Sequence, residues 1–68
     1  MAGRELEARI QEVLGALPEN QRAALLLSRV EGLSYREVAE ALEVSESAVK
    51  SLVFRATATL RESLAEFL

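Results

Sequence analysis

The chain contains no cysteine, no histidine and no aspartate. Without cysteine, it can form neither a disulfide nor a thiolate metal site. Without histidine and aspartate, glutamate is the only common metal ligand and general base that remains. Because the glutamates are spread over the exposed faces of the expected helices, we expect a protein that is not an enzyme. For the same reason, we expect it to hold no metal and no cofactor.

Proline, glycine and aromatic residues are also scarce, with one proline, three glycines and three aromatic side chains (Tyr35, Phe54 and Phe67). Alanine, leucine and valine dominate the apolar half of the composition, which favours an all-α helical bundle over a sheet. A length of 68 residues allows one domain with one small core. No apolar run is long enough to span a bilayer, and we expect a cytoplasmic domain.

The spacing of apolar residues predicts four helices, at about 3–16, 19–31, 34–42 and 46–66. Pro18 separates the first two, and Gly32 ends the second, which we expect to be the most buried. Ser34 and Glu37 have the spacing of a capping box at the start of the third helix. Ser45 or Ser47 is expected to cap the fourth. Leu64, Phe67 and Leu68, near its end, could pair with another chain, but we expect them to fold onto the first helix and leave the chain a monomer.

Residues 34–55 have the pattern of a helix-turn-helix, in which two helices cross at a steep angle. Ala39 provides the small side chain that the crossing needs, and Val44 fills the gap at the turn. Val49 and Leu52 face back toward the first of the two helices. Glu43 occupies the position where such turns often have a left-handed glycine, so we expect strain of about 1 kcal/mol there.

The outward face of the fourth helix suits the major groove of DNA. Lysine and arginine can donate to guanine, serine can donate or accept, and phenylalanine can contact a thymine methyl group. Phe54 either contacts such a partner or rests on the surface of the bundle. The starts of the last two helices are candidate phosphate sites, since free backbone N–H groups lie there. The candidate residues are Lys50, Ser51, Phe54 and Arg55 for bases, and Ser34, Tyr35, Arg36, Ser45 and Ser47 for phosphates.

The sequence resembles region 4 of the sigma-70 family, and in particular its extracytoplasmic-function branch. The resemblance covers residues 17–61 and includes Leu17-Pro18, "EGLSYREVA" at 31–39, "AVKS" at 48–51 and "FRA" at 54–56. It implies binding to the −35 promoter element and to the β flap of RNA polymerase, with an anti-sigma factor as a further partner. It assigns base reading to Lys50, Ser51, Phe54 and Arg55. We therefore expect residues 1–68 to be one domain excised from a longer sigma factor.

The formal net charge of the chain, −3, is unusual for the DNA-binding function that this resemblance implies. DNA-binding domains usually carry a basic surface. The family often has arginine at the position of Ser28, and Arg29 beside it points elsewhere on the helix. Basic residues are also common in the family at Thr57 and Thr59. We therefore expect weak binding to promoter DNA by the isolated domain, with the polymerase supplying much of the affinity.

Two alternatives remain open at this point. The first is an acidic protein-interaction module with the same fold, which binds the polymerase or an anti-sigma factor but not DNA. The second is the output domain of a LuxR-type response regulator, which has a similar four-helix layout and shares the "VK" pair at 49–50. Leu17-Pro18 and the segment 54–56 argue against the second alternative.

Overall fold

The structure, a computed structural model, describes residues 2–67 and has four α-helices. They are α1 (Ala2–Ala16), α2 (Glu19–Arg29), α3 (Tyr35–Leu42) and α4 (Glu46–Ser63), followed by a short 3-10 helix, η1 (Ala65–Phe67). The described residues form no strand, which confirms the all-α prediction. Within the same residues, no helix is both long enough and apolar enough to cross a membrane.

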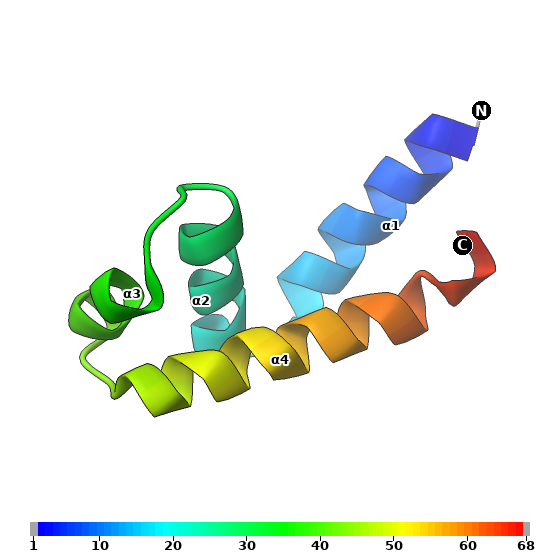
Figure 1. The fold of residues 1–68 in the computed structure, drawn as a ribbon. Coiled ribbons are helices and arrows are strands. Elements are labelled where there is room, and N and C mark those ends of the chain that lie inside the picture. The colour runs from blue at the N-terminus through cyan, green and yellow to red at the C-terminus, as the bar shows by residue number, and fades with distance from the viewer. Residues whose placement is uncertain (1, 68) are drawn as a thin grey trace.

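The longest helix, α4, runs the length of the molecule and forms its base (Figure 1). α2 and α3 pack against its first half, whereas α1 lies over its second half and diverges from it toward the N-terminus (Figure 1). The most extensive packing is between α2 and α4. The helix-turn-helix, formed by α3 and the start of α4, therefore lies at the opposite end of the molecule from the start of α1.

The core consists of aliphatic side chains, mostly alanine and valine, from α2, α3, α4 and the α1–α2 connection. Val38 on α3 and Val49 on α4 are completely buried. Because alanine and valine are short, the helix axes can approach closely, and no aromatic ring is needed to fill the space. The buried cluster comprises Leu17, Ala24, Leu25, Val38, Ala39, Val49, Val53 and Ala56.

Arg22 joins α2 to the end of α1. Its Nη1 atom donates to the carbonyl oxygens of Leu14 at 3.4 Å, Gly15 at 3.4 Å and Leu17 at 3.3 Å. The last carbonyls of a helix have no partner within that helix, and a cation there also interacts favourably with the helix dipole. Arg22 thereby caps α1 and sets its position relative to α2.

The second helix ends two residues earlier than predicted, at Arg29 instead of residue 31. Gly32 has the expected left-handed conformation, with φ of 75°. The N–H of Leu33 donates to the carbonyl of Leu27 at 3.0 Å, so the loop takes up a carbonyl of the last helical turn. Val30 is consequently 71% exposed and lies outside the core. α2 is nevertheless the helix with the smallest share of exposed residues, as expected, since three of its eleven residues are exposed, against half of those in α3 and α4.

The fourth helix ends at Ser63 and does not continue to residue 66 as predicted. The chain turns at Leu64, where φ is −104° and ψ is 8°, and continues as η1. The turn brings Oε1 of Glu66 within 3.1 Å of Nη2 of Arg9 on α1. Phe67 is half-buried and lines a hollow with residues of α1, which a straight helix would not allow. The C-terminal segment up to Phe67 therefore folds back toward α1, as expected, and Leu68 lies outside the described residues.

Candidate nucleic-acid interface

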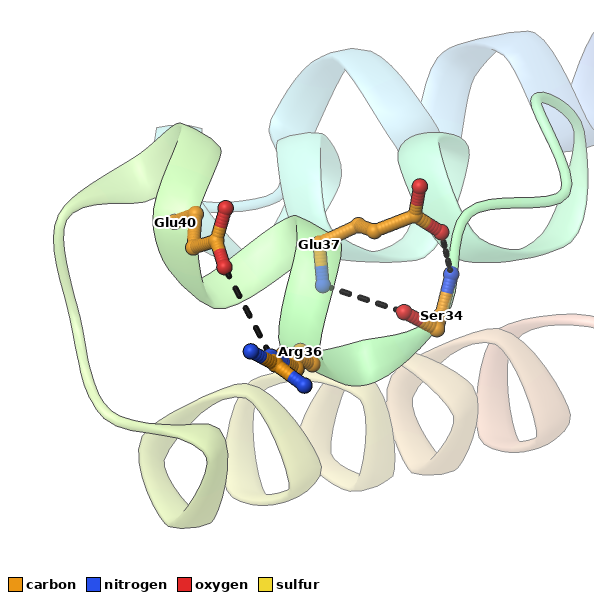
Figure 2. Close-up of polar contacts among 4 residues, drawn as sticks. All are labelled: Ser34, Arg36, Glu37 and Glu40. Atoms are coloured by element: carbon orange, nitrogen blue, oxygen red, sulfur yellow. Dashed lines mark hydrogen bonds and ion pairs between the residues drawn. The ribbon is translucent and has the colours of Figure 1, made fainter.

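The start of α3 is fixed by a reciprocal pair of hydrogen bonds between Ser34 and Glu37. The N–H of Glu37 donates to Oγ of Ser34 at 3.1 Å, and the N–H of Ser34 donates to Oε1 of Glu37 at 2.8 Å (Figure 2). The capping box predicted from the sequence is therefore present. The backbone N–H of Ser34, followed by its hydroxyl group, lowers the pKa of the Glu37 carboxyl, because both stabilise its charged form.

The lowered pKa of Glu37 predicts a loss of stability in acid. A carboxyl whose pKa is lower in the folded protein stabilises the fold when it is ionised. This contribution is lost as the pH falls from the ordinary glutamate value of 4.5 through the lowered pKa of the folded protein. Glu37→Gln keeps an oxygen that can accept the hydrogen bond from Ser34 but cannot titrate. Thermal unfolding between acid and neutral pH should show a shallower acid loss for Glu37→Gln than for the wild type. Identical pH profiles would contradict this role of Glu37.

The turn between α3 and α4 comprises Glu43, Val44 and Ser45. Glu43 has φ of 58° and ψ of 45°, the left-handed conformation expected from the sequence. The N–H of Val44 donates to the carbonyl of Ala39 at 3.0 Å, which closes the end of α3. Oγ of Ser45 accepts a hydrogen bond from the N–H of Ala48 at 3.0 Å, so Ser45, and not Ser47, caps α4. This turn sets the direction in which α4 leaves α3.

Replacing Glu43 by glycine should stabilise the domain. Glycine adopts the left-handed conformation without steric cost, although it also gains freedom in the unfolded chain. We expect the free energy of unfolding to rise by roughly 0.5–1 kcal/mol. Glu43→Ala is the control, because it removes the same charge but retains the strained Cβ. Urea unfolding that ranks the alanine variant above the glycine variant would refute this explanation.

The two faces of α4 differ as the helix-turn-helix pattern predicts. Val49 and Ala56 are completely buried, Val53 is 3% exposed, and Leu52 is half-buried. On the outward face, Phe54 is 75% exposed, so it does not rest on the bundle as the alternative supposes. The remaining outward residues, Ser47, Lys50, Ser51 and Arg55, are exposed as well.

The four candidate base-reading side chains, Lys50, Ser51, Phe54 and Arg55, lie together on this outward face. They line one shallow hollow of about 510 Å³ on the surface of α4. Two cations, a hydroxyl group and an aromatic ring are thus available to one ligand from a single helix. Such a set can donate to guanine and contact a thymine methyl group.

The five candidate phosphate-binding residues lie at the starts of the two helices. Tyr35 is half-buried, and Ser34, Arg36, Ser45 and Ser47 are exposed. The hydroxyl groups of Ser34 and Ser45 accept capping hydrogen bonds, and the hydroxyl of Ser45 retains its O–H to donate. Nε of Arg36 lies 3.7 Å from Oε1 of Glu40 in an exposed ion pair (Figure 2). Such surface pairs contribute little, so a phosphate can compete for Arg36.

Acidic side chains also border the outward face of α4. Glu43 and Glu46 are exposed at the turn and in the first turn of the helix. Nowhere in the described part of the chain do three or more potential metal-binding residues come together. Glu43 and Glu46 place negative charge beside the candidate base-reading residues, which is unfavourable for any nearby anion.

The family described as "Sigma-70, region 4" matches residues 7–60 of the chain. The chain belongs to this family. It is 37% identical over 60 residues to the RNA polymerase sigma-H factor of Pseudomonas aeruginosa, covering 88% of this chain and 31% of that protein. It is 41% identical over 61 residues to the ECF RNA polymerase sigma factor SigE of Mycolicibacterium smegmatis, covering 90% of this chain and 24% of that protein. The ECF RNA polymerase sigma-E factor of Haemophilus influenzae is 38% identical over 56 residues, with coverages of 82% and 30%.

Membership of the region 4 family confirms the resemblance identified from the sequence and decides against the LuxR-type alternative. Region 4 has a promoter-recognition role in transcription initiation, typically through binding of the −35 element. The chain spans less than a third of the length of these relatives.

Around the outward face of this region 4 domain, the structure places two arginines that the sequence analysis did not select. Arg29 and Arg61 line a second hollow, of about 570 Å³, together with Lys50 and Phe54. Arg29, which was expected to point elsewhere on the helix than Ser28, thus lines the same hollow as Lys50 and Phe54. Spacings of four, seven and eleven residues from Lys50 place Phe54, Thr57 and Arg61 on one stripe of α4, so the sequence carried a signal for Arg61. Arg29 could not be found in this way, because its position depends on how α2 packs against α4.

Proposed function

We propose that this domain reads the −35 promoter element as part of an extracytoplasmic-function sigma factor that directs bacterial RNA polymerase. The observation that carries the proposal is that Lys50, Ser51, Phe54 and Arg55 line one exposed hollow on the second helix of a helix-turn-helix. In this arrangement α4 enters the major groove. Lys50 and Arg55 donate to guanine O6 and N7, Ser51 donates or accepts, and Phe54 contacts a thymine methyl group.

The phosphate backbone is held at the starts of the two helices in this proposal. Backbone N–H groups at a helix start favour anions, and the exposed side chains there add further donors. Ser34, Tyr35 and Arg36 serve the start of α3, and Ser45 and Ser47 serve the start of α4. These contacts fix the orientation of the domain without reading the sequence of the DNA.

The domain is proposed to act in the cytoplasm as one monomeric part of a longer protein. Its partners are promoter DNA, the β flap of the polymerase and, when the factor is held inactive, an anti-sigma factor. Support comes from the sigma factors that it resembles, of which the aligned part covers 24% to 31%. The net charge of −3 reduces affinity for DNA, and binding of the polymerase offsets this loss by holding the domain at the promoter.

Titration of the isotope-labelled domain with promoter and scrambled duplexes at low salt tests the proposal by NMR. We expect shift changes concentrated in residues 45–57 and larger for the promoter duplex. The first residues of α1 serve as the internal control, since the start of this helix lies at the other end of the molecule (Figure 1). Shift changes spread evenly over the domain, or equal for both duplexes, would contradict base reading by α4.

The acidic balance of the chain favours a second candidate function, a module that binds the polymerase or an anti-sigma factor but not DNA. Glu43 and Glu46 lie close to the proposed reading face. The hydroxyl of Ser28, where the family often has arginine, donates within its own helix to the carbonyls of Ala24 at 2.8 Å and Leu25 at 3.2 Å. The absence of duplex binding at low salt, combined with tight binding to the polymerase flap, would establish this function. Salt-sensitive duplex binding would exclude it.

A further inference from the structure

The hollow that contains Arg29 and Arg61 is built from three helices. α2 contributes its last residue, Arg29, and α3 contributes its first residue, Tyr35. Thr57 and Arg61 come from α4 and lie beyond the four candidate base-reading residues along the chain. Lys50 and Phe54 line this hollow and also the hollow formed by the four candidate base-reading residues (the reading hollow), so the two adjoin.

This hollow is basic although the chain as a whole is acidic. Arg29, Lys50 and Arg61 face a single carboxylate, that of Glu62, among its lining residues. The ion pairs found in the described part of the chain join Arg9 to Glu66 and Arg36 to Glu40, and therefore involve none of these three cations. Unpaired cations that converge on one concave surface attract an anion.

We propose that Arg29 and Arg61, with the hydroxyl groups of Tyr35 and Thr57, bind backbone phosphates of the duplex whose bases α4 reads. This inference rests on the proposed function. Guanidinium and hydroxyl groups are typical donors to DNA phosphates, and guanidinium groups bind phosphate with two parallel hydrogen bonds. The hollow therefore supplies two strong and two weaker donors beside the reading face.

The position of Arg61 along α4 fits a phosphate at the edge of the groove. With a rise of about 1.5 Å per residue, Arg61 lies about 10 Å beyond Phe54 along the helix axis. The major groove is about 12 Å wide, so a helix that reads bases near Phe54 passes the sugar-phosphate backbone near Arg61. Arg29 reaches the same surface from the end of α2.

These contacts also compensate for the missing positive charge at position 28, where this chain has serine and the family often has arginine. The Ser28 hydroxyl is engaged within α2 and brings no positive charge to the interface. Arg29, one residue later, lines the hollow next to α4 and supplies the cation at this end of α2. The hollow thus provides the basic surface that the net charge of the chain does not indicate.

Salt dependence of DNA binding tests the proposal with Arg29→Ala, Arg61→Ala and the double variant, measured on promoter and scrambled duplexes. The affinity K falls as the salt concentration rises, and each lost phosphate contact should make the plot of log K against log salt less steep by about 0.9. We expect each single variant to weaken binding to both duplexes about three- to tenfold at low salt, so that their ratio is preserved. Arg29→Lys should retain most of the slope. Arg4→Ala is the matched control, because it removes an exposed arginine on α1, far from the hollow.

The outcomes separate this inference from the proposed function. If the wild type binds the promoter duplex selectively but both alanine variants keep its salt slope, the phosphate hollow is wrong and base reading stands. If the wild type binds no duplex at low salt, both proposals fail. If Arg29→Ala and Arg61→Ala weaken binding to a protein partner but not to either duplex, the hollow is a protein-binding surface and the phosphate proposal is wrong. Circular dichroism checks folding, which these exposed residues should leave unchanged.

Discussion

Replacing Phe54 by alanine is expected to lower the affinity for the promoter duplex about thirtyfold, equivalent to about 2 kcal/mol. The ring is 75% exposed in the free domain and lies where the reading hollow and the phosphate hollow meet. An aromatic side chain at such a central position becomes fully buried on binding, and its removal leaves a gap at the thymine methyl group. Fluorescence anisotropy of a labelled duplex at low salt measures the effect.

Val30→Ala is the matched control for this prediction. Val30 is the other large apolar side chain with high exposure in the described residues, at 71%, but it lies at the end of α2. Its truncation removes exposed apolar surface from the same domain without touching the outward face of α4. Equal effects of Phe54→Ala and Val30→Ala would show that Phe54 has no specific role. Unchanged unfolding curves in both variants would confirm that the change in affinity is not a folding defect.

Replacing Ala39 by leucine is expected to remove about 2–3 kcal/mol from the free energy of unfolding. Ala39 is 7% exposed in the core cluster, and its carbonyl accepts the hydrogen bond from the N–H of Val44 that closes the turn. A larger side chain has no free volume to occupy between α3 and α4 and forces the two helices apart. A domain of this size often has only about 3–5 kcal/mol of stability, so most of it would be lost.

Ala41→Leu provides the control for the Ala39 substitution. Ala41 lies on the same helix, α3, but its side chain is exposed. The change in volume and helix propensity is identical, so the difference between the two variants isolates the effect of close packing. Urea unfolding should leave Ala41→Leu within about 0.5 kcal/mol of the wild type. Similar losses in both variants would mean that the helix crossing does not require a small residue at Ala39.

The features that were predictable from the sequence depend on residues close together along the chain. The capping box of Ser34 and Glu37 spans three residues, and the left-handed conformation of Glu43 follows from its place in a short turn. The outward face of α4 follows from helical periodicity alone, because the buried residues of one helix identify its exposed ones. These local rules also predicted the grouping of Lys50, Ser51, Phe54 and Arg55.

The features that were missed depend on contacts between distant segments. α4 ends at Ser63 because the following residues turn toward α1, where Glu66 pairs with Arg9 across most of the length of the chain. No local signal near residue 63 specifies that partner. Arg29 is a similar case, since only the packing of α2 on α4 places its side chain beside Lys50. Helix periodicity fixes the angle of a side chain around its own axis but not the neighbour that it meets.

The position of Tyr35 allows binding to be followed by the intrinsic fluorescence of the domain. It is the only tyrosine, and the chain has no tryptophan, so the ultraviolet fluorescence of the domain comes essentially from this one ring. Tyr35 lies at the edge of the hollow formed by Arg29, Lys50 and Arg61, not in the core. Its emission should therefore depend on what occupies that hollow, and we expect a bound nucleic acid to quench it. The occupancy of the hollow can be followed without an attached dye.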